Sequence, residues 1–173
     1  MQLVVFIKGN NKYSVEDKKG RTLYNIKKKG FGNNNKLFLL NSSNYHLYTL
    51  IGSGMDSLSY TIEHNDSNFM SVICKSKFLA PMIIECKGNS ISYKLVSENR
   101  RDFKIMSDEE QKGTIETYVS SSKELQYEIN IDDQLFDDYI PLFAIAVDKI
   151  FGETNRNPQI INEIIQEKGN KNQ

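Results

Sequence analysis

The sequence predicts a mostly β protein, a closed antiparallel barrel of about twelve strands around a central apolar helix near the C-terminus. Two observations lead to this fold class. Apolar and polar residues alternate with a period of two through most of the chain, as in strands that bury one face. Residues 138–151 then break the alternation with an almost continuous apolar run, which fits a helix better than another strand.

The alternating segments are joined by short polar turns. In the first pair, residues 13–17 and 22–29 flank the turn "DKKG", where Gly20 supplies a positive φ. The later pairs are "KLFLLN" with "HLYTLI", "LSYTIEH" with "FMSVICKS", "PMIIECK" with "ISYKLVS", and "DFKIMS" with "TIETYVS", before a last segment "LQYEINI". Such a series of hairpins is typical of an antiparallel sandwich or barrel.

The apolar segment favours the barrel. At ~1.5 Å per residue, residues 140–151 extend for about 18 Å, which is too short to cross a bilayer core of about 30 Å. A helix without a polar face needs protein around it, and a barrel of this size is too wide for its own side chains to fill. We expect Asp137 or Asp138 to cap the helix, Pro141 to lie in its first turn, and Gly152 to follow its end.

Asp148 is the one acidic residue within this apolar run, and it admits two interpretations. It is either a buried functional acid or a structural residue that reaches the barrel mouth or accepts from backbone amides there.

The residues after the helix form a separate unit. We expect residues 1–152 to be the barrel domain and 153–173 to be a short amphipathic helical tail, capped by Asn157, begun by Pro158 and ended at Gly169. One face of this tail carries an isoleucine stripe: Ile160, Ile161, Ile164 and Ile165. The stripe is a candidate element for docking a protein partner or for self-association.

Composition limits the classes of function. Lys plus Arg and Asp plus Glu both number 22, so no global charge favours nucleic acid as a partner. The N-terminal apolar run lacks the basic region and cleavage site of a signal peptide, and no segment predicts a transmembrane helix. We therefore expect a cytoplasmic protein that can associate peripherally with a membrane. Cys74 and Cys86 are expected as free thiols there, although a hairpin centred near Ala80 would also place them opposite each other.

The order of these elements resembles the tubby C-terminal-like superfamily, in particular its bacterial tubby-like and plant LURP-one-related members. The segments that carry the resemblance are "YSVEDKKGRTLYNIKKKGF" at the start and "YEINIDDQLFDDYIPLFAIAVDKIF" at the end, and it covers about residues 2–152. It implies a barrel closed around a central helix and a relationship to the phospholipid scramblases. Tubby proteins bind phosphoinositide head groups through basic surface residues, so the resemblance also implies a phospholipid-binding surface.

The segment "NIKKKGFGNNNK" is the strongest candidate for such a surface. Lys27 and Lys29 would share one face of a strand and Lys28 the other, so the strand should end at the barrel rim near Lys28. With Lys36 they would form a patch for an anionic head group, and Phe31 could insert beside it. The alternative is a solvated hairpin whose lysines prevent edge-to-edge aggregation.

Two further charged groups are weaker candidates. Arg100 and Arg101 are adjacent and could grip a phosphate, or they could form ion pairs with Glu98 and Asp102. The acidic segment 132–138 lacks the spacing of a calcium loop, and acidic residues before a helix already favour its dipole, so no metal site is predicted.

No catalytic grouping or cofactor motif is found, and His46 and His64 lie far apart in the sequence. The sequence therefore predicts a non-enzymatic module without a cofactor, which binds anionic phospholipid at the cytoplasmic face of a membrane. A protein-interaction or self-association module that uses the isoleucine stripe is the alternative.

Overall fold

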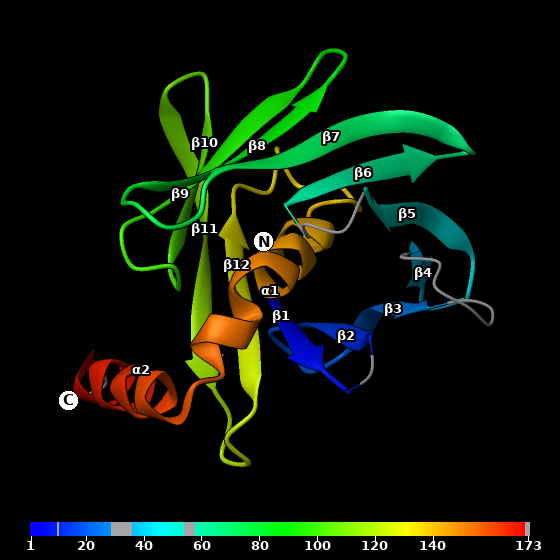
Figure 1. Ribbon diagram of the computed structural model, residues 1–173. Helices are drawn as coiled ribbons and strands as arrows, with labels where there is room; N and C mark the ends of the chain where they lie inside the picture. The colour runs from blue at the N-terminus through cyan, green and yellow to red at the C-terminus, as the bar shows by residue number, and fades with distance from the viewer. Residues whose placement is uncertain (10, 29–35, 54–57, 172–173) are drawn as a thin grey trace.

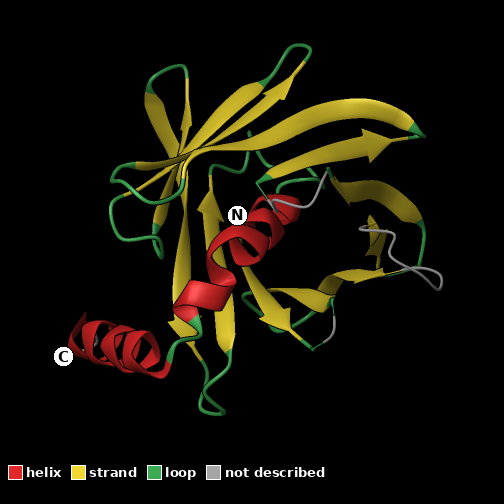
Figure 2. Cartoon of the chain, viewed as in Figure 1, coloured by secondary structure: helices red, strands yellow, loops and turns green. Residues whose placement is uncertain are grey.

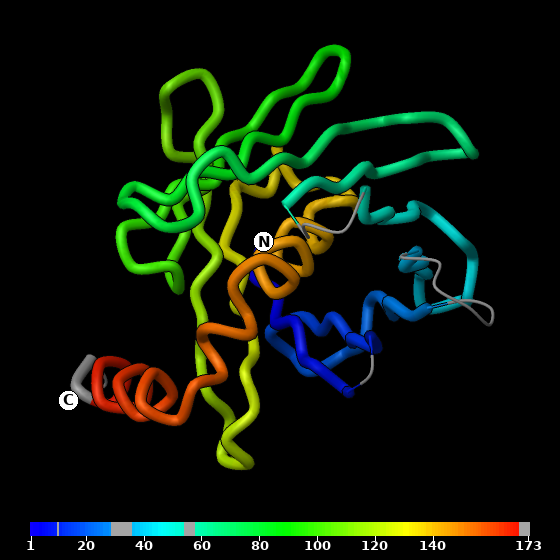
Figure 3. Tube along the Cα trace, viewed as in Figure 1, coloured from blue at the N-terminus to red at the C-terminus, as the bar shows by residue number. Residues whose placement is uncertain are grey.

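A computed structural model describes residues 1–9, 11–28, 36–53 and 58–171, with side chains up to residue 169. Within these ranges twelve strands form a closed barrel, in which each strand pairs antiparallel with its neighbours in the sequence and β1 pairs with β12. The predicted closed antiparallel barrel is confirmed. Figure 3 shows the chain running back and forth around the ring.

The strands are β1 (Gln2–Ile7), β2 (Lys12–Asp17), β3 (Thr22–Lys28), β4 (Lys36–Asn41), β5 (His46–Gly52), β6 (Ser59–His64), β7 (Ser67–Ser76), β8 (Met82–Gly88), β9 (Ser92–Ser97), β10 (Phe103–Ser107), β11 (Glu110–Val119) and β12 (Leu125–Ile131). Two helices follow, α1 (Pro141–Asn155) and α2 (Pro158–Lys171).

Alternation of side chains explains most of the strands. In β12 every second residue is buried, from Leu125 to Ile131, and the residues between them are half-buried. The alternation did not predict strand β1, because its residues Leu3 to Phe6 are all apolar. Only Leu3 and Val5 of this run are buried in the core, whereas Val4 and Phe6 stay half-exposed on the outer face.

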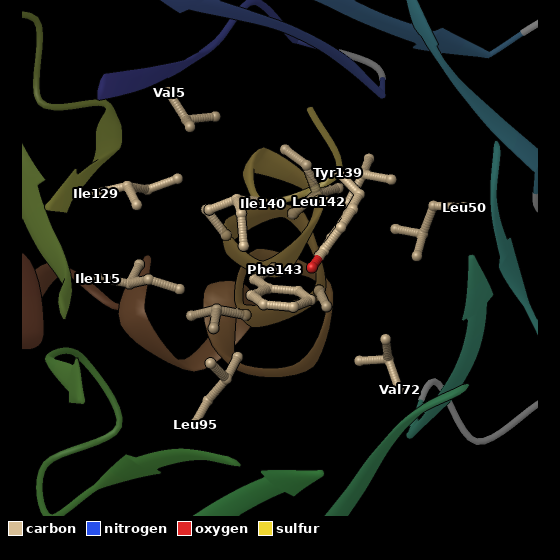
Figure 4. Close-up of a cluster of buried hydrophobic side chains, with 14 of the residues drawn as sticks. Val5, Leu50, Val72, Leu95, Ile115, Ile129, Tyr139, Ile140, Leu142 and Phe143 are labelled. Atoms are coloured by element: carbon tan, nitrogen blue, oxygen red, sulfur yellow. The ribbon is translucent and has the colours of Figure 1, made fainter. Parts of the chain in front are cut away.

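The helix α1 contributes much of the hydrophobic core. Its residues Pro141 to Asp148 are all buried, and so are Ile150, Phe151, Gly152 and Asn155. Figure 4 shows Ile140, Leu142 and Phe143 together with inward-pointing side chains of six strands: Val5, Leu50, Val72, Leu95, Ile115 and Ile129. Helix and strands therefore share one apolar cluster, which accounts for the absence of a polar face in the sequence of α1.

The ends of α1 differ from those predicted. Pro141 is in the first turn, as expected, but the N-cap is Ile140, which has no side-chain cap. The Asp138 carboxylate instead accepts the hydroxyl of Tyr24 from β3. Gly152 does not follow the helix but lies within it, so the helix passes the expected boundary at residue 152. Glycine is needed there because the side chains of Asp148 and Arg156 lie where a Cβ atom would be.

The helix α2 lies outside the ring of strands (Figures 1 and 2) and packs mainly on β11. It begins at Pro158 as predicted but continues past Gly169, where no other group approaches the position of a side chain. Neither helix within the described part of the chain is long and apolar enough to cross a bilayer.

Candidate functional site

The two ends of the barrel carry different charges. Because neighbouring strands are antiparallel and follow one another in sequence, alternate turns lie at opposite ends. We call the end with the β1–β2, β3–β4, β5–β6, β7–β8, β9–β10 and β11–β12 connections the lysine end. The other end, with the remaining turns and the 132–140 connection to α1, is called the acidic end.

We consider the described residues in these turns together with the two nearest residues of each flanking strand. Among them, basic side chains predominate at the lysine end. They are Lys8, Lys12, Lys27, Lys28, Lys36, Lys75, Lys77, Arg100, Arg101, Lys104 and Lys123, against Glu98, Asp102 and Glu124. The acidic end has the reverse balance. Its acids are Glu16, Asp17, Glu63, Asp66, Asp108, Glu109, Glu110, Asp132, Asp133, Asp137 and Asp138, against Lys18, Lys19, Arg21 and Lys87. A chain with no net charge is thus strongly polarised along its barrel.

The predicted lysine hairpin lies at the lysine end. As expected, β3 ends at Lys28, and Lys36 begins β4, so these lysines lie at the rim. Lys12 of β2 pairs directly with Lys27, which extends the exposed basic surface to the neighbouring hairpin. Lys29, like Phe31, lies outside the described residues.

The two predicted arginines have different surroundings. Arg100 has a positive φ of 65° in the β9–β10 turn, and its Nη2 donates to the carbonyl of Phe78 at 2.9 Å. Arg101 turns toward α2, where its guanidinium pairs with Glu163 at 3.3 Å and with Glu167 at 3.0 Å. The two guanidinium groups therefore point to different partners, and the partners of Arg101 come from α2 rather than from its own turn.

A second ion-pair group fixes α2 to the barrel. The Nζ of Lys168 lies 3.1 Å from Asp102 and 2.7 Å from Glu116, and it lies over the ring of Tyr118. Burial alone would lower the pKa of Lys168, but the hydrogen bonds to Glu116 and Asp102 raise it above its usual value.

The isoleucine stripe of the tail is largely used within the chain. Ile164 is buried, Ile160 and Ile161 are half-buried, and Ile165 is exposed. The surface of α2 that remains for another molecule is therefore smaller than the sequence predicted.

Asp148 on α1 is a buried acid, and it is 5% exposed. Its carboxylate accepts the hydroxyls of Tyr13 at 2.9 Å and Tyr127 at 2.7 Å, and it pairs with Arg156 at 2.6 Å. The sequence left a functional acid and a structural residue open, and the structural interpretation named backbone amides as donors, whereas the donors are side chains from β2, from β12 and from Arg156 at the C-cap of α1. Burial, and then the Asp148 carboxylate, raise the pKa of both tyrosines well above 10.0.

Lys149 connects this polar group to the lysine end. Its Nζ donates to Asn11 in the β1–β2 turn and lies 5.9 Å from the centre of the Tyr13 ring. Burial lowers the pKa of Lys149, and the neighbouring Asp148 carboxylate opposes this effect.

An open groove of about 790 Å³ lies at the acidic end. It was missed in the sequence because its walls come from distant segments: Met1, Gln2, Asp17, Lys18, Lys19, Arg21, Leu23, Gln111, Lys112, Gly113, Thr114, Asn130, Ile131, Asp132 and Asp133. Charges of both signs line it, and some pair locally, as Asp17 does with Arg21. This balance gives the groove no clear preference for a charged ligand.

The remaining candidates carry no site. Cys74 is opposite Ile84 and Cys86 is opposite Val72, so the alternative of two opposed cysteines does not hold and the expected free thiols are found. A bulge between Cys74 and Ser76 shifts the register, and both thiols are free. In the described part of the chain, no three His, Cys, Asp or Glu side chains are grouped as metal ligands.

No family model matches the chain, and no curated protein matches it at a significant level. A solved structure of a protein from Arabidopsis thaliana is similar, with a TM-score of 0.61 over 89% of this chain and 90% of that chain. The two sequences are 14% identical, so the similarity shows a shared fold alone.

Proposed function

We propose that the protein is a non-enzymatic module of the tubby-like type that binds anionic phospholipid at the cytoplasmic face of a membrane. The contact surface is the lysine end of the barrel. The observation that carries the proposal is the segregation of charge between the two ends, with exposed lysines on neighbouring strands at one rim.

The geometry of a rim supports a membrane rather than a single small ligand. Lys12, Lys27, Lys28 and Lys36 belong to three successive strands, and the four side chains are exposed instead of lining a closed pocket. A flat anionic surface attracts such a distributed set, with about 1 kcal/mol for each lysine near the membrane. The acidic end would be repelled, so the attraction also orients the barrel.

Binding to vesicles that float in a density gradient tests the proposal. Vesicles of phosphatidylcholine with phosphatidylserine should carry the protein, and vesicles of phosphatidylcholine alone should not. Because screening shortens the reach of the charges, binding should weaken between about 0.1 M and 1 M salt. Replacing Lys27, Lys28 and Lys36 with alanine should weaken binding about a hundredfold.

The matched control is Lys18→Ala with Lys19→Ala, because these two exposed lysines lie at the acidic end. This variant should bind anionic vesicles as tightly as the unmodified protein. Equal losses for both variants, or binding that ignores lipid charge and salt, would overturn the proposal.

The protein-interaction alternative rests on α2. Its remaining support is the exposed Ile165 beside the half-buried Ile161. Ile165→Asp should lower self-association or partner recovery if α2 is the docking element, and it should leave vesicle binding unchanged.

A further inference from the structure

Two adjacent apolar side chains are exposed in the turn between β7 and β8. Phe78 is 74% exposed and Leu79 is 78% exposed, which makes them the most exposed large hydrophobic residues in the described part of the chain. The same protein buries Phe103, Phe143 and Phe151 almost completely. An adjacent pair of this size in water is unfavourable unless it has a partner.

The backbone of this turn is held while its side chains project. The carbonyl of Phe78 accepts from Arg100, and the carbonyl of Leu79 accepts the hydroxyl of Ser76 at 2.7 Å. Both carbonyls therefore keep a hydrogen bond within the protein if water is removed from the turn. This matters near hydrocarbon, where an unsatisfied backbone group is costly.

Basic groups surround the apolar pair. The Nζ of Lys77 lies 5.8 Å from the centre of the Phe78 ring, and the guanidinium of Arg100 contacts the same turn. Lys75 is close by at the end of β7, with its side chain 52% exposed and its Nζ 4.0 Å from Glu85. An apolar tip with cations around it is complementary to a bilayer whose head groups are anionic and whose interior is apolar.

We infer that Phe78 and Leu79 insert into the boundary between the head groups and acyl chains of an anionic bilayer. This inference rests on the proposed function, because the turn belongs to the lysine end. It adds a second signal to the lysines: they supply long-range attraction, and the apolar pair supplies short-range anchoring that salt does not screen.

The absence of tryptophan from the chain gives a direct test. Phe78→Trp introduces a single tryptophan at the tip of the turn, and its emission can be excited at wavelengths that the tyrosines do not absorb. Tyr45→Trp is the matched control, because Tyr45 is 72% exposed but lies in the β4–β5 turn at the acidic end. Each variant is mixed with phosphatidylserine-containing vesicles, with and without brominated acyl chains, and flotation of the same samples measures binding.

Insertion predicts a blue shift of Phe78→Trp emission on binding and quenching by the brominated chains, with neither change for Tyr45→Trp. If both variants float with the vesicles but Phe78→Trp shows no shift, the inference is overturned while the proposed function stands. That result would leave a protein partner as the occupant of the turn. If neither variant floats, the proposed function and the inference both fail.

A second pair of variants separates the two signals. Phe78→Ser with Leu79→Ser should weaken vesicle binding about tenfold and leave its dependence on salt unchanged, since no charge is altered. Tyr45→Ser should have no effect. A double variant that binds as tightly as the unmodified protein would overturn the inference even if its lysines bind lipid.

Discussion

Arg156 reaches the carboxylate of Asp148 across Gly152, with 2.6 Å between Nη2 and Oδ1. Asp148 and Gly152 lie at an interval of four on one side of α1, and Arg156, the C-cap residue, follows at the next interval of four. A Cβ atom on Gly152 would lie 2.5 Å from Oδ1 of Asp148 and 2.5 Å from Nη1 of Arg156. The glycine therefore leaves the space in which a half-exposed arginine neutralises a buried carboxylate.

Gly152→Ala should destabilise the protein by about 1–3 kcal/mol, although alanine is the better helix former by about 1 kcal/mol. The added methyl displaces Arg156 and leaves Asp148 with only the tyrosine hydroxyls. Denaturant unfolding measures the change. Gly169→Ala in α2 is the control, since nothing lies within 4 Å of its added Cβ, and it should stabilise or have little effect. If both variants gain stability, Gly152 has no such role.

Alkaline pH should unfold the protein through its buried tyrosines. Burial and the Asp148 carboxylate raise the pKa of Tyr13 and Tyr127, and burial raises the pKa of Tyr48 to about 12, from the ordinary 10.0. In the unfolded chain these hydroxyls lose their protons near pH 10, whereas the folded chain keeps them. Unfolding therefore releases protons, so the stabilisation is complete below about pH 10 and is lost as the pH rises above it.

The midpoint of denaturant unfolding at pH 8 to 12 measures this effect, and the absorbance of tyrosinate should rise together with unfolding. Tyr13→Phe removes one such group and should make the fall in stability above pH 10 shallower, at a cost of about 1 kcal/mol at neutral pH. A midpoint that is constant up to pH 12 would contradict the assignment.

The barrel could be predicted from the sequence because its signal is local. Alternation within each strand and polar turns between strands require no knowledge of distant residues, and the turn at Gly20 has the positive φ expected of it. The ends of α1 could not be predicted in the same way. Asp138 does not cap the helix, because the N-cap is Ile140, and its carboxylate instead accepts from Tyr24, 114 residues earlier. Gly152 resembles a helix stop in sequence, and only the Asp148–Arg156 pair reveals its use.

The candidate site was predicted only in part, because it also depends on contacts between residues that are far apart in the sequence. The lysines of one hairpin are visible in the sequence, but their position at the same end of the barrel as Lys8 and Lys12 depends on the order of the strands. The partners of Arg101 lie 62 and 66 residues away on a helix that the sequence assigned to other partners. The apolar pair in "KFLAP" was present in the sequence, but its exposure depends on how the β7–β8 turn leaves the barrel.

The docking of α2 should depend on Lys168. Lys168→Met keeps an apolar stem but leaves Asp102 and Glu116 without their cation, so α2 should detach more often. The expected loss is about 1–2 kcal/mol, which corresponds to roughly tenfold faster amide exchange in α2. Exchange in β12 should stay unchanged. Lys94→Met, which alters an exposed pair with Glu109 at 3.8 Å, should leave α2 protected. Equal protection of α2 in both variants would show that Lys168 does not hold the helix, which would leave Ile164 and the ion pairs of Arg101 as its attachment.

The core role of α1 gives the largest expected effect of a single substitution. Ile145 is 0% exposed in the cluster that α1 shares with the strands, so Ile145→Asp places an unpaired carboxylate among apolar side chains. The buried charge and the lost packing together should cost more than the roughly 5–15 kcal/mol stability of a typical domain. We therefore expect the variant to lose cooperative unfolding rather than to unfold with a shifted midpoint.

Ile165→Asp is the matched control, because Ile165 is 43% exposed on α2 and its replacement should cost less than about 1 kcal/mol. Thermal unfolding followed by circular dichroism distinguishes the two, and a sharp transition for Ile145→Asp near that of the unmodified protein would show that α1 is not part of the cooperative core.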